Sequence, residues 1–316
     1  MDGKYLQLRR LLLWRNLSLS WDPQQSFEQP RPLHLEIGFG NGEYLARQAA
    51  SHPEVNFLGM ELHWESVRRT LRRLAQQNLD NVRLLQVDVQ SALRWLLPDA
   101  CLDGFVALFP CPWPKRQQER FRLFSTPFMS HLNRACKPGA KGLVVTDHPG
   151  LRDYALAQAQ GSGLGVQLVE VPPTYNTKYE RRWTGEGQQV FYELHYHRVA
   201  PAPVQRPAEV DVQTLFLENF DPEAMERELQ GEVDDLVVEF RQQLYDPKKE
   251  RWMVLTTVVE DSLSQTFWIE VARKDGQWCI RPSLGGGYLP TIGVQRAMHR
   301  IHDTALQLSG HQLQRG

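Results

Sequence analysis

The sequence has little of several features that would place it in a specialised class of proteins. Only four of its 316 residues are cysteine, and Cys101, Cys111, Cys136 and Cys279 show no paired short spacing. This pattern indicates neither a disulfide framework nor a zinc site, so we expect no metal and a reducing, cytoplasmic compartment. The apolar run at residues 11–14 is too short for a signal sequence or a membrane span, and we expect no membrane attachment.

A strong charge of one sign is also missing, because the formal net charge is −1. Residues 1–204 carry 24 basic and 19 acidic side chains, whereas residues 205–316 carry 12 basic and 18 acidic ones. The overall basic character that is usual for a nucleic-acid binder is therefore absent, and any such binding has to rest on local patches.

The length of the chain favours two domains. Prolines 201, 203 and 207 predict an extended, semi-rigid linker. We therefore divide the chain into an amino-terminal arm (1–30), a first domain (31–198), a linker (199–209) and a small α+β domain (210–316). For the arm we expect at most a short helix and assign no chemistry.

The small domain shows a sequence of predicted elements but no motif that carries chemistry. We expect a strand at 211–219, a helix at 222–229, strands at 236–245, 252–260, 266–273 and 278–281, and a helix at 294–308. Gly285, Gly286 and Gly287 lack the strand-to-helix setting that a phosphate loop needs. The acidity of this domain argues against a general RNA clamp, and we expect a surface for dimerisation or for a partner.

The first domain opens with a strand, a glycine loop and a helix. The strand is Leu33–Ile37, the loop contains Gly38, Gly40 and Gly42, and the helix covers residues 43–50. Glycines allow positive φ and a close approach of the backbone to a ligand, and a helix amino terminus presents free N–H groups. This order predicts a nucleotide-type binding site.

Acidic residues recur at the ends of successive predicted strands. Glu36 lies in the first strand, Glu61 follows the strand at 55–60, and Asp88 follows the strand at 82–87. Acids at such positions accept hydrogen bonds from ribose hydroxyls and from an adenine amine, and they favour a ligand with positive charge. Further strands are expected at 105–109, 143–147, 166–171 and 190–198, with helices at 64–77, 90–97 and 121–136.

The fourth strand ends in the stretch Phe-Pro-Cys-Pro-Trp-Pro-Lys at residues 109–115. Proline cannot continue the interior of a sheet, so the chain leaves the sheet at its carboxyl end, where open α/β folds bind ligands. Trp113 offers a stacking face, and a run of cations follows it: Lys115, Arg116, Arg120 and Arg122. Stacking together with such charge indicates nucleic acid; the alternative is that Trp113 only fills the loop against the core.

With these motifs in order, residues 30–198 resemble the Rossmann-like, S-adenosylmethionine-dependent methyltransferases. The loop at 109–115 resembles the tRNA (guanine-N7)-methyltransferase family, whose pattern there is Phe-Pro-Asp-Pro-Trp followed by a basic run. Residues 143–147 (Leu-Val-Val-Thr-Asp) and 177–182 (Thr-Lys-Tyr-Glu-Arg-Arg) resemble two later motifs of that family. The resemblance implies a seven-stranded sheet, S-adenosylmethionine as cofactor, tRNA as partner, and methyl transfer to N7 of a guanine in the variable loop.

The resemblance also implies roles for individual residues. The expected cofactor-binding residues are Glu36, Gly38, Gly40, Gly42, Glu61, Asp88 and Cys111. The expected substrate-binding residues are Trp113, Lys115, Asp147, Thr177, Lys178, Tyr179, Glu180 and Arg181. The candidate catalytic residues are Asp147, Glu180 and Cys111.

Cys111 departs from the family pattern, because an aspartate is usual at this position. Three interpretations follow. The protein is an active guanine-N7 methyltransferase that relies on Asp147 or Glu180, or it binds S-adenosylmethionine or tRNA with little turnover. In the third, Cys111 is the nucleophile of a pyrimidine C5-methyltransferase. Trp113, Lys115 and the motif at 177–182 follow the N7 pattern and favour the first.

Overall fold

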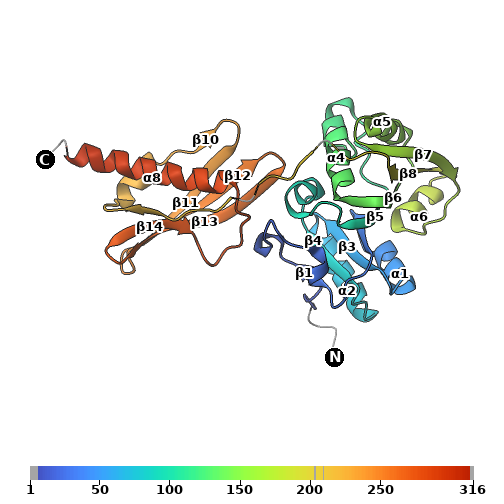
Figure 1. Ribbon diagram of the computed structural model, residues 1–316, viewed down its shortest axis with the longest axis horizontal. Coiled ribbons are helices and arrows are strands. Elements are labelled where there is room, and N and C mark those ends of the chain that lie inside the picture. Colours follow the sequence, from blue (N-terminus) through green and yellow to red (C-terminus); the bar gives the residue numbers. More distant parts are fainter. Residues whose placement is uncertain (1–5, 203, 209, 314–316) are drawn as a thin grey trace. The chain divides into compact units, whose positions relative to one another are not determined.

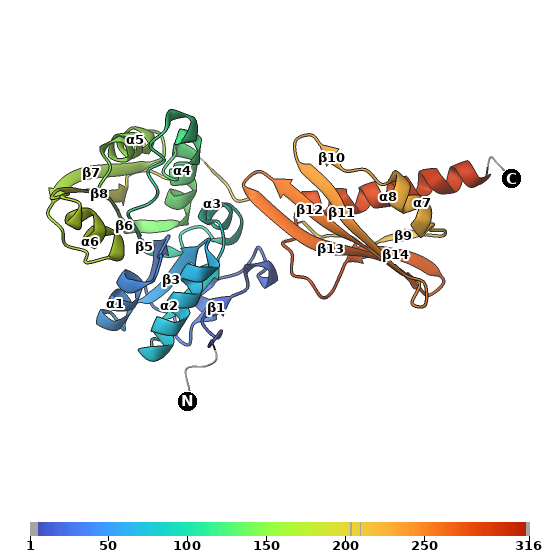
Figure 2. The same cartoon turned by 180° about the vertical axis from the view of Figure 1, so that it is seen from behind.

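The computed structural model of the chain describes residues 6–202, 204–208 and 210–313, and Figures 1 and 2 show it from opposite sides. Residues 1–5 of the predicted arm, positions 203 and 209 of the predicted linker, and the last three residues lie outside the described part. The chain divides into two compact units. Unit 1 contains the residues up to Trp14 together with Ser20–Pro207, and unit 2 contains Arg15–Leu19 together with the residues from Ala208 onward.

Unit 1 is built on a Rossmann-like mixed sheet, as predicted. In chain order its main strands are β2 (Leu33–Ile37), β3 (Asn56–Glu61), β4 (Val82–Gln86), β5 (Leu102–Leu108), β6 (Cys136–Thr146), β7 (Leu164–Val171) and β8 (Phe191–Arg198). The spatial order is β1-β4-β3-β2-β5-β6-β8-β7. Strands β2 to β6 are parallel, and β8 runs antiparallel to both of its neighbours. The carboxyl ends of five strands therefore share one edge.

All seven predicted strands are present, and the sheet has an eighth that the sequence did not predict. The additional strand, β1 (Leu11–Leu12), comes from the arm and pairs parallel with β4. Next to it the fully buried Arg10 donates hydrogen bonds to the carbonyl of Leu79 at 2.6 Å and to the carboxylate of Asp80 at 2.7 Å. A two-residue strand is too short to show an alternating pattern, which is why the sequence did not reveal it.

Helices cover both faces of this sheet (Figure 1). They are α1 (Glu43–Ser51), α2 (Trp64–Gln76), α3 (Val89–Ser91) with the π-helical turn Ala92–Leu96, α4 (Thr126–Ala135), α5 (Pro149–Ala159) and α6 (Lys178–Gly185). The predicted helix at 121–136 begins five residues late. Phe121 ends a 3-10 helix, and α4 starts only where the Ser125 hydroxyl accepts a hydrogen bond from the N–H of Phe128.

Unit 2 is a six-stranded antiparallel sheet against which a long helix packs (Figure 2). Its elements are β9 (Leu215–Leu217), α7 (Pro222–Glu228), β10 (Glu232–Val233), β11 (Val237–Asp246), β12 (Arg251–Glu260), β13 (Leu263–Lys274), β14 (Gln277–Pro282) and α8 (Ile292–Leu313). The strands lie in the order β10-β11-β12-β13-β14-β9. Across the described residues, no helix is both long and apolar enough to cross a bilayer.

Two details of unit 2 differ from expectation. The strand predicted at 211–219 is reduced to β9, because the N–H of Gln213 donates to the side chain of Gln295 on α8 at 2.7 Å instead of to a strand. The glycine run at 285–287 has a packing role at its last residue. A Cβ on Gly287 would lie 2.8 Å from the carbonyl oxygen of Arg15, so glycine is required where residues 15–19 join the unit.

Candidate active site

The candidate site lies at the carboxyl edge of the parallel strands of unit 1. Strand β5 pairs with β6 in a register that sets Leu108 opposite Val145. The loop at 109–115 and Asp147 therefore leave the sheet side by side, as we expected for neighbouring strands. Glu61 ends β3, and Asp88 follows β4 by two residues. The fold thus brings four predicted parts of the site to a single edge.

The glycine loop after β2 adopts a backbone that other residues rarely take. Gly38, Gly40 and Gly42 have φ values of +67°, +54° and +68°. Gly42 is also the N-cap of α1, and a Cβ there would lie 2.4 Å from a side-chain carbon of Thr70. All three glycines are therefore favoured by their backbone conformation, and Gly42 is also needed for the packing of α1 against α2.

Glu61 and Asp88 shape the turns that follow their strands. The Glu61 carboxylate accepts hydrogen bonds from the backbone N–H of Gly40 at 3.0 Å and from those of Leu62 and His63 at 2.9 and 3.1 Å. Asp88 caps α3 by accepting from the N–H of Ser91 at 3.0 Å. A carboxylate has about four acceptor positions, so these contacts leave room for a ligand, and the cofactor role of both acids stays a prediction.

Glu36 is the most unusual group of the edge. Only 4% of it is exposed, and within the described residues its Oε2 atom has no hydrogen-bond partner. Burial raises the pKa of this carboxyl well above its ordinary value, and the positive charge of Arg47 opposes the shift only in part. A buried carboxyl with an open oxygen fits a ligand that brings hydrogen-bond donors or positive charge, as S-adenosylmethionine does.

The loop after β5 holds two aromatic residues in a strained backbone conformation. Phe109 and Trp113 have φ values of +53° and +44°, which cost on the order of 1–3 kcal/mol each for such residues. The N–H of Phe109 donates to the carbonyl of Val145 at 2.8 Å, and its ring contacts Phe191 at 5.5 Å between centroids. The surrounding structure therefore stabilises a specific loop shape.

Arg122 fixes the same loop from the other side. Its guanidinium donates to the carbonyls of Pro112 and Trp113 at 2.9 and 3.3 Å and lies over the ring of Tyr154. The side chain is only 7% exposed. The expectation that Arg122 belongs to a phosphate-seeking run was therefore wrong, because the backbone carbonyls of the loop take up its donors.

The remaining predicted residues of this loop reach the surface to different extents. Cys111 and Lys115 are exposed, whereas Trp113 is half-buried with its ring against Phe121 at 5.4 Å. The contact with Phe121 leaves part of the indole accessible. The stacking role of Trp113 therefore stays a prediction.

The motif at 177–182 forms the start of α6. Thr177 is the N-cap and accepts a hydrogen bond from the N–H of Glu180 at 3.2 Å. Glu180 is 3% exposed, and its carboxylate accepts from the N–H groups of Thr174 at 2.6 Å, Tyr175 at 2.9 Å and Asn176. Thr177 and Glu180 occupy the positions of a capping box, but the Glu180 carboxylate accepts from the three N–H groups that precede the N-cap residue. This arrangement gives Glu180 a clear part in shaping the segment 174–176, while its catalytic role stays a prediction.

Glu43 and Arg47, which are absent from the predicted site residues, connect this segment to α1. Arg181 donates to both carboxylate oxygens of Glu43, at 3.2 and 3.0 Å, and Arg47 donates to the carbonyls of Tyr175 and Asn176. Glu43 and Arg47 are four residues apart on the helix that follows the glycine loop, and this spacing places both on one face. The four-residue spacing was the only feature of the sequence that indicated a common role for Glu43 and Arg47.

A cavity of about 310 Å³ opens beside the segment. It is lined by Pro173, Thr174, Asn176, Glu180, Arg181 and Thr184. Its volume is at the lower end of the range of roughly 300–1,000 Å³ that is usual for ligand sites. The predicted substrate residues Lys178 and Tyr179 are exposed on α6.

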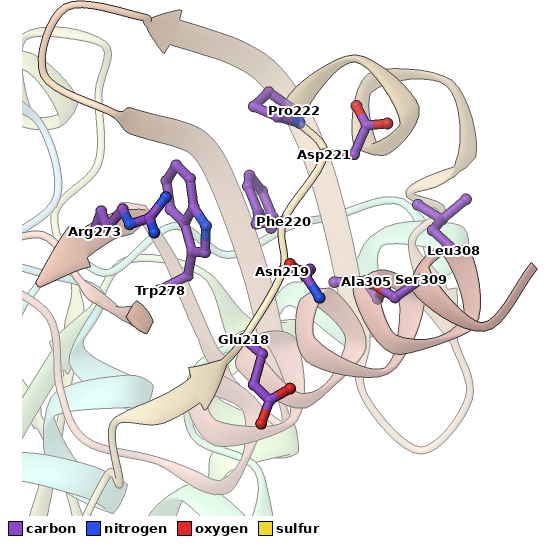
Figure 3. A pocket seen from close by; sticks show the side chains of 10 residues that line it. All are labelled: Glu218, Asn219, Phe220, Asp221, Pro222, Arg273, Trp278, Ala305, Leu308 and Ser309. Carbon is purple, nitrogen blue, oxygen red and sulfur yellow. The ribbon is translucent and has the colours of Figure 1, made fainter. Parts of the chain in front are cut away.

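Unit 2 contains a cavity of about 470 Å³, shown in Figure 3. Phe220 and Trp278 line it, with ring centroids 5.3 Å apart. Two of its charged residues have structural partners: Asp221 caps α7, and Arg273 pairs with Glu250 at 3.4 Å. Asp221 and Arg273 therefore have structural roles, and we assign no chemistry to this cavity.

Comparison with known proteins places the chain among methyltransferases. A family model described as a putative methyltransferase matches residues 30–193. A tRNA (guanine-N(7)-)-methyltransferase from Thermus thermophilus is 33% identical over 300 residues, covering 93% of this chain and 95% of the relative. Proteins with the same name from Deinococcus radiodurans and Chlorobium phaeobacteroides are 31% and 35% identical, covering 86% and 51% of this chain and 88% and 79% of their own.

The two longer matches also extend into unit 2, because 300 and 286 aligned residues exceed the length of unit 1. The family model covers strands β2 to β7 and with them the glycine loop, the strand-end acids and the loop after β5. The chain therefore belongs to the tRNA (guanine-N7)-methyltransferase family.

Proposed function

We propose that this chain transfers a methyl group from S-adenosylmethionine to N7 of a guanine in the variable loop of tRNA. The observation that carries the proposal is the buried Glu36 carboxyl with its open Oε2 atom, which immediately precedes the glycine loop at the edge shared by β2 to β6. A family of guanine-N7 methyltransferases that spans nearly the whole chain supports it.

The chemistry asks for alignment and negative potential rather than for a base. Guanine N7 already has an in-plane lone pair, so no proton has to leave before the methyl group is transferred. Alignment of donor and acceptor contributes up to about 7–11 kcal/mol, and negative charge stabilises a guanine that becomes cationic. Asp147 suits the second task, because it follows β6 next to the loop and its carboxylate accepts no hydrogen bond from any described residue.

Glu180 and Cys111 contribute differently. The Glu180 carboxylate already accepts three backbone N–H groups, so we propose that it acts mainly by holding the segment 174–176. Cys111 is exposed and uncharged as a thiol, and we assign it to the wall of the cofactor site.

The cofactor supplies an activated methyl group on a sulfonium when it is bound. We propose that Glu36, Glu61, Asp88 and the glycines 38, 40 and 42 hold it. For tRNA we propose contacts from Trp113, Lys115 and Asp147 and from Thr177, Lys178, Tyr179 and Arg181. The exposure of Lys115, Lys178 and Tyr179 supports this assignment.

The test uses labelled S-adenosylmethionine and unmodified tRNA, followed by mass spectrometry of the nucleosides. Formation of 7-methylguanosine is the expected result, and mapping it to the variable loop tests the position. Formation of 5-methylcytidine or 5-methyluridine would instead select the C5 mechanism with Cys111 as nucleophile. Intact cofactor binding without any product would select a binding protein.

We also propose that the protein acts in the cytoplasm and that unit 2 joins two copies of the chain. Unpaired cysteines support the compartment. In unit 2, β10 pairs with β11 only at Val237 and Val238, so the rest of β11 is an open sheet edge in the described part of the chain, where Leu244 and Tyr245 are 49% and 45% exposed. An open strand edge favours pairing with a second copy. Sedimentation analysis should give a dimer for the whole chain and a monomer for a chain that ends after Pro207.

A further inference from the structure

We infer that Glu43 and Arg47 of α1 are positioning residues, which hold the substrate segment 174–176 against the helix that begins at the glycine loop. The inference rests on the proposed function, because it assumes that the loop binds S-adenosylmethionine and that α6 and the residues before it face the guanine. Helix α1 then couples the glycine loop, which binds the cofactor, to the segment 174–176.

The backbone of the segment is held from two sides by side chains of opposite charge. On one side the Glu180 carboxylate accepts the N–H groups of residues 174, 175 and 176. On the other side Arg47 donates to the carbonyls of Tyr175 and Asn176, and Arg181 donates to the Asn176 carbonyl at 2.6 Å. Side chains thus satisfy nearly all backbone polar groups of the segment.

The side chain of Tyr175 adds a third anchor. Its hydroxyl donates to the Glu193 carboxylate on β8, and its ring lies 6.1 Å from that of Tyr44 on α1. Asn176 adopts a left-handed backbone with φ of +47°, which asparagine tolerates better than most residues. The segment therefore has a defined conformation that depends on α1, α6 and β8 together.

The same contacts continue into the glycine loop. Glu43 lies 3.8 Å from Arg73 of α2, and Arg73 donates to the carbonyl of Asn41 at 3.3 Å. Asn41 also donates to the Glu43 carboxylate at 3.1 Å. A continuous path of ion pairs and hydrogen bonds therefore runs from Asn41 in the loop, through Glu43 and Arg181, to Asn176 in the segment.

The exposure of these charged side chains indicates whether their substitution should change the stability of the fold or the rate of the reaction. The Arg181 side chain is 50% exposed and Arg47 is exposed, whereas the Glu43 side chain is 18% exposed. Ion pairs with an exposed partner contribute little to global stability, and Gln keeps the size of Glu43, so both substitutions should leave the fold intact. Their effect should appear where geometry matters, because a small displacement of an aligned group costs on the order of 100-fold in rate.

The path also predicts coupling between the two ligands. If cofactor binding orders the glycine loop, it favours the same arrangement of α1 that orders the segment. By reciprocity, tRNA and S-adenosylhomocysteine, the non-reactive product of the cofactor, should then each strengthen the binding of the other. The expected factor for the wild type lies in the usual range of about 5–150-fold.

The experiment compares Arg47→Met and Glu43→Gln with the wild type in three measurements. These are the single-turnover rate of methyl transfer, the affinity for S-adenosylhomocysteine without tRNA, and the affinity for tRNA with and without S-adenosylhomocysteine. Arg31→Met is the matched control, because Arg31 also donates to a backbone carbonyl, that of Pro53 at 2.6 Å, but precedes the amino-terminal end of β2.

We expect both α1 variants to lose about 10-fold or more of the single-turnover rate and most of the coupling. Affinity for S-adenosylhomocysteine in the absence of tRNA should be unchanged in Glu43→Gln. Arg47→Met also removes a charge that acts on the Glu36 carboxyl, so Arg47→Lys, which keeps the charge, is the variant compared for this affinity. Arg47→Lys should recover part of the rate, and Arg31→Met should behave as the wild type. A double-mutant cycle of Glu43→Gln with Arg181→Met should show that the two losses are not additive.

An Arg47→Met protein with normal rate and normal coupling would overturn the inference. So would a variant in which cofactor affinity and melting temperature fall together with the rate, because that pattern indicates a general structural role. A wild type that binds both ligands cooperatively but makes no 7-methylguanosine would overturn the proposed function alone, since loss of cooperativity in Arg47→Met would still support the positioning role.

Discussion

Glu61 accepts a hydrogen bond of 3.0 Å from the backbone N–H of Gly40, so the end of β3 holds the glycine loop that follows β2. We expect Glu61→Ala to weaken binding of S-adenosylmethionine by about 1.5–3 kcal/mol for each hydrogen bond lost to the charged group. Calorimetry measures this directly. Glu65→Ala is the control, because Glu65 is an exposed carboxylate on α2 that pairs with Arg68. A wild type that does not bind the cofactor would contradict the assignment.

Substitution of Cys111 should change the rate of methyl transfer little, whereas substitution of Asp147 should lower it strongly. If the reaction is N7 methylation, Cys111→Ala should change the rate only slightly, because a thiol adds little to a cationic transition state. Asp147→Ala should cost about 2.7–4 kcal/mol, the scale of a lost preorganised electrostatic group. Cys111→Asp, which introduces the residue usual in the family, should keep or raise the rate. Methyl transfer to tRNA under single-turnover conditions is the measurement.

The same cysteine variants also separate the other mechanisms. A C5-methyltransferase would lose all turnover in both, because no other group replaces the covalent nucleophile. An inactive Cys111→Ala enzyme with normal cofactor affinity would thus refute our assignment. Glu180→Ala is expected to lower the rate as well, through the segment 174–176 that it holds.

Glu36 should make the stability of the ligand-free protein depend on pH. Its pKa is raised in the folded state by burial, so above the unfolded value the folded chain binds more protons than the unfolded chain, and stability falls as pH rises towards the folded pKa. Glu36→Gln cannot ionise and should lack this loss. Its stability advantage in denaturant unfolding should therefore grow as pH increases from about 4 to 8.

Cofactor binding provides a second measurement on Glu36. A cationic ligand favours the ionised carboxyl, so binding should release protons in the wild type and not in Glu36→Gln. Calorimetry in buffers with different ionisation enthalpies detects this release. Two results together would exclude the effect. These are a stability difference between wild type and Glu36→Gln that does not change with pH, and equal proton release by the two proteins on cofactor binding.

Arg122→Met should slow methyl transfer without changing cofactor affinity. The substitution removes the hydrogen bonds to the carbonyls of Pro112 and Trp113, and each is worth about 1.5–3 kcal/mol when one group is charged. The strained backbone at Trp113 should then relax. A variant with normal kcat and normal KM for tRNA would show that the loop does not need this support.

A chain that ends after Pro207 should fold and bind S-adenosylmethionine. Pro207 is the natural limit, since Arg206 donates to the carbonyl of Trp95 at 3.1 Å within unit 1. Circular dichroism, thermal unfolding and calorimetry test the fragment. A fragment with its strand content and cofactor affinity lost would mean that unit 2 is required for unit 1 to fold.

The sheet edge was predictable because its signals are local. Strands of five to eight residues that end in Glu61, Asp88 or a proline are visible in the sequence, and parallel order then brings their ends together. The start of α4 was misplaced because the apolar residues at 121–124 continue a helical pattern, although the cap at Ser125 excludes them from the helix.

The connection between α1 and α6 was not predictable for a different reason. Glu43 and Arg181 are 138 residues apart. Glu43 looks like an ordinary residue of a solvated helix face, and the motif at 177–182 predicts a substrate contact for Arg181 rather than a contact with α1. Arg122 likewise resembles its exposed basic neighbours in sequence. Only its place below the loop after β5, where it donates to the carbonyls of Pro112 and Trp113, determines that it is buried.

The division of unit 2 between the two ends of the chain has a consequence for biosynthesis. Residues 15–19 leave the ribosome well before Gly287, against which Arg15 and Asn16 pack and which is made more than 260 residues later. Domains generally fold in the order in which they are translated. A nascent chain therefore completes its methyltransferase unit while this early segment still waits for its partner, and the second unit closes last.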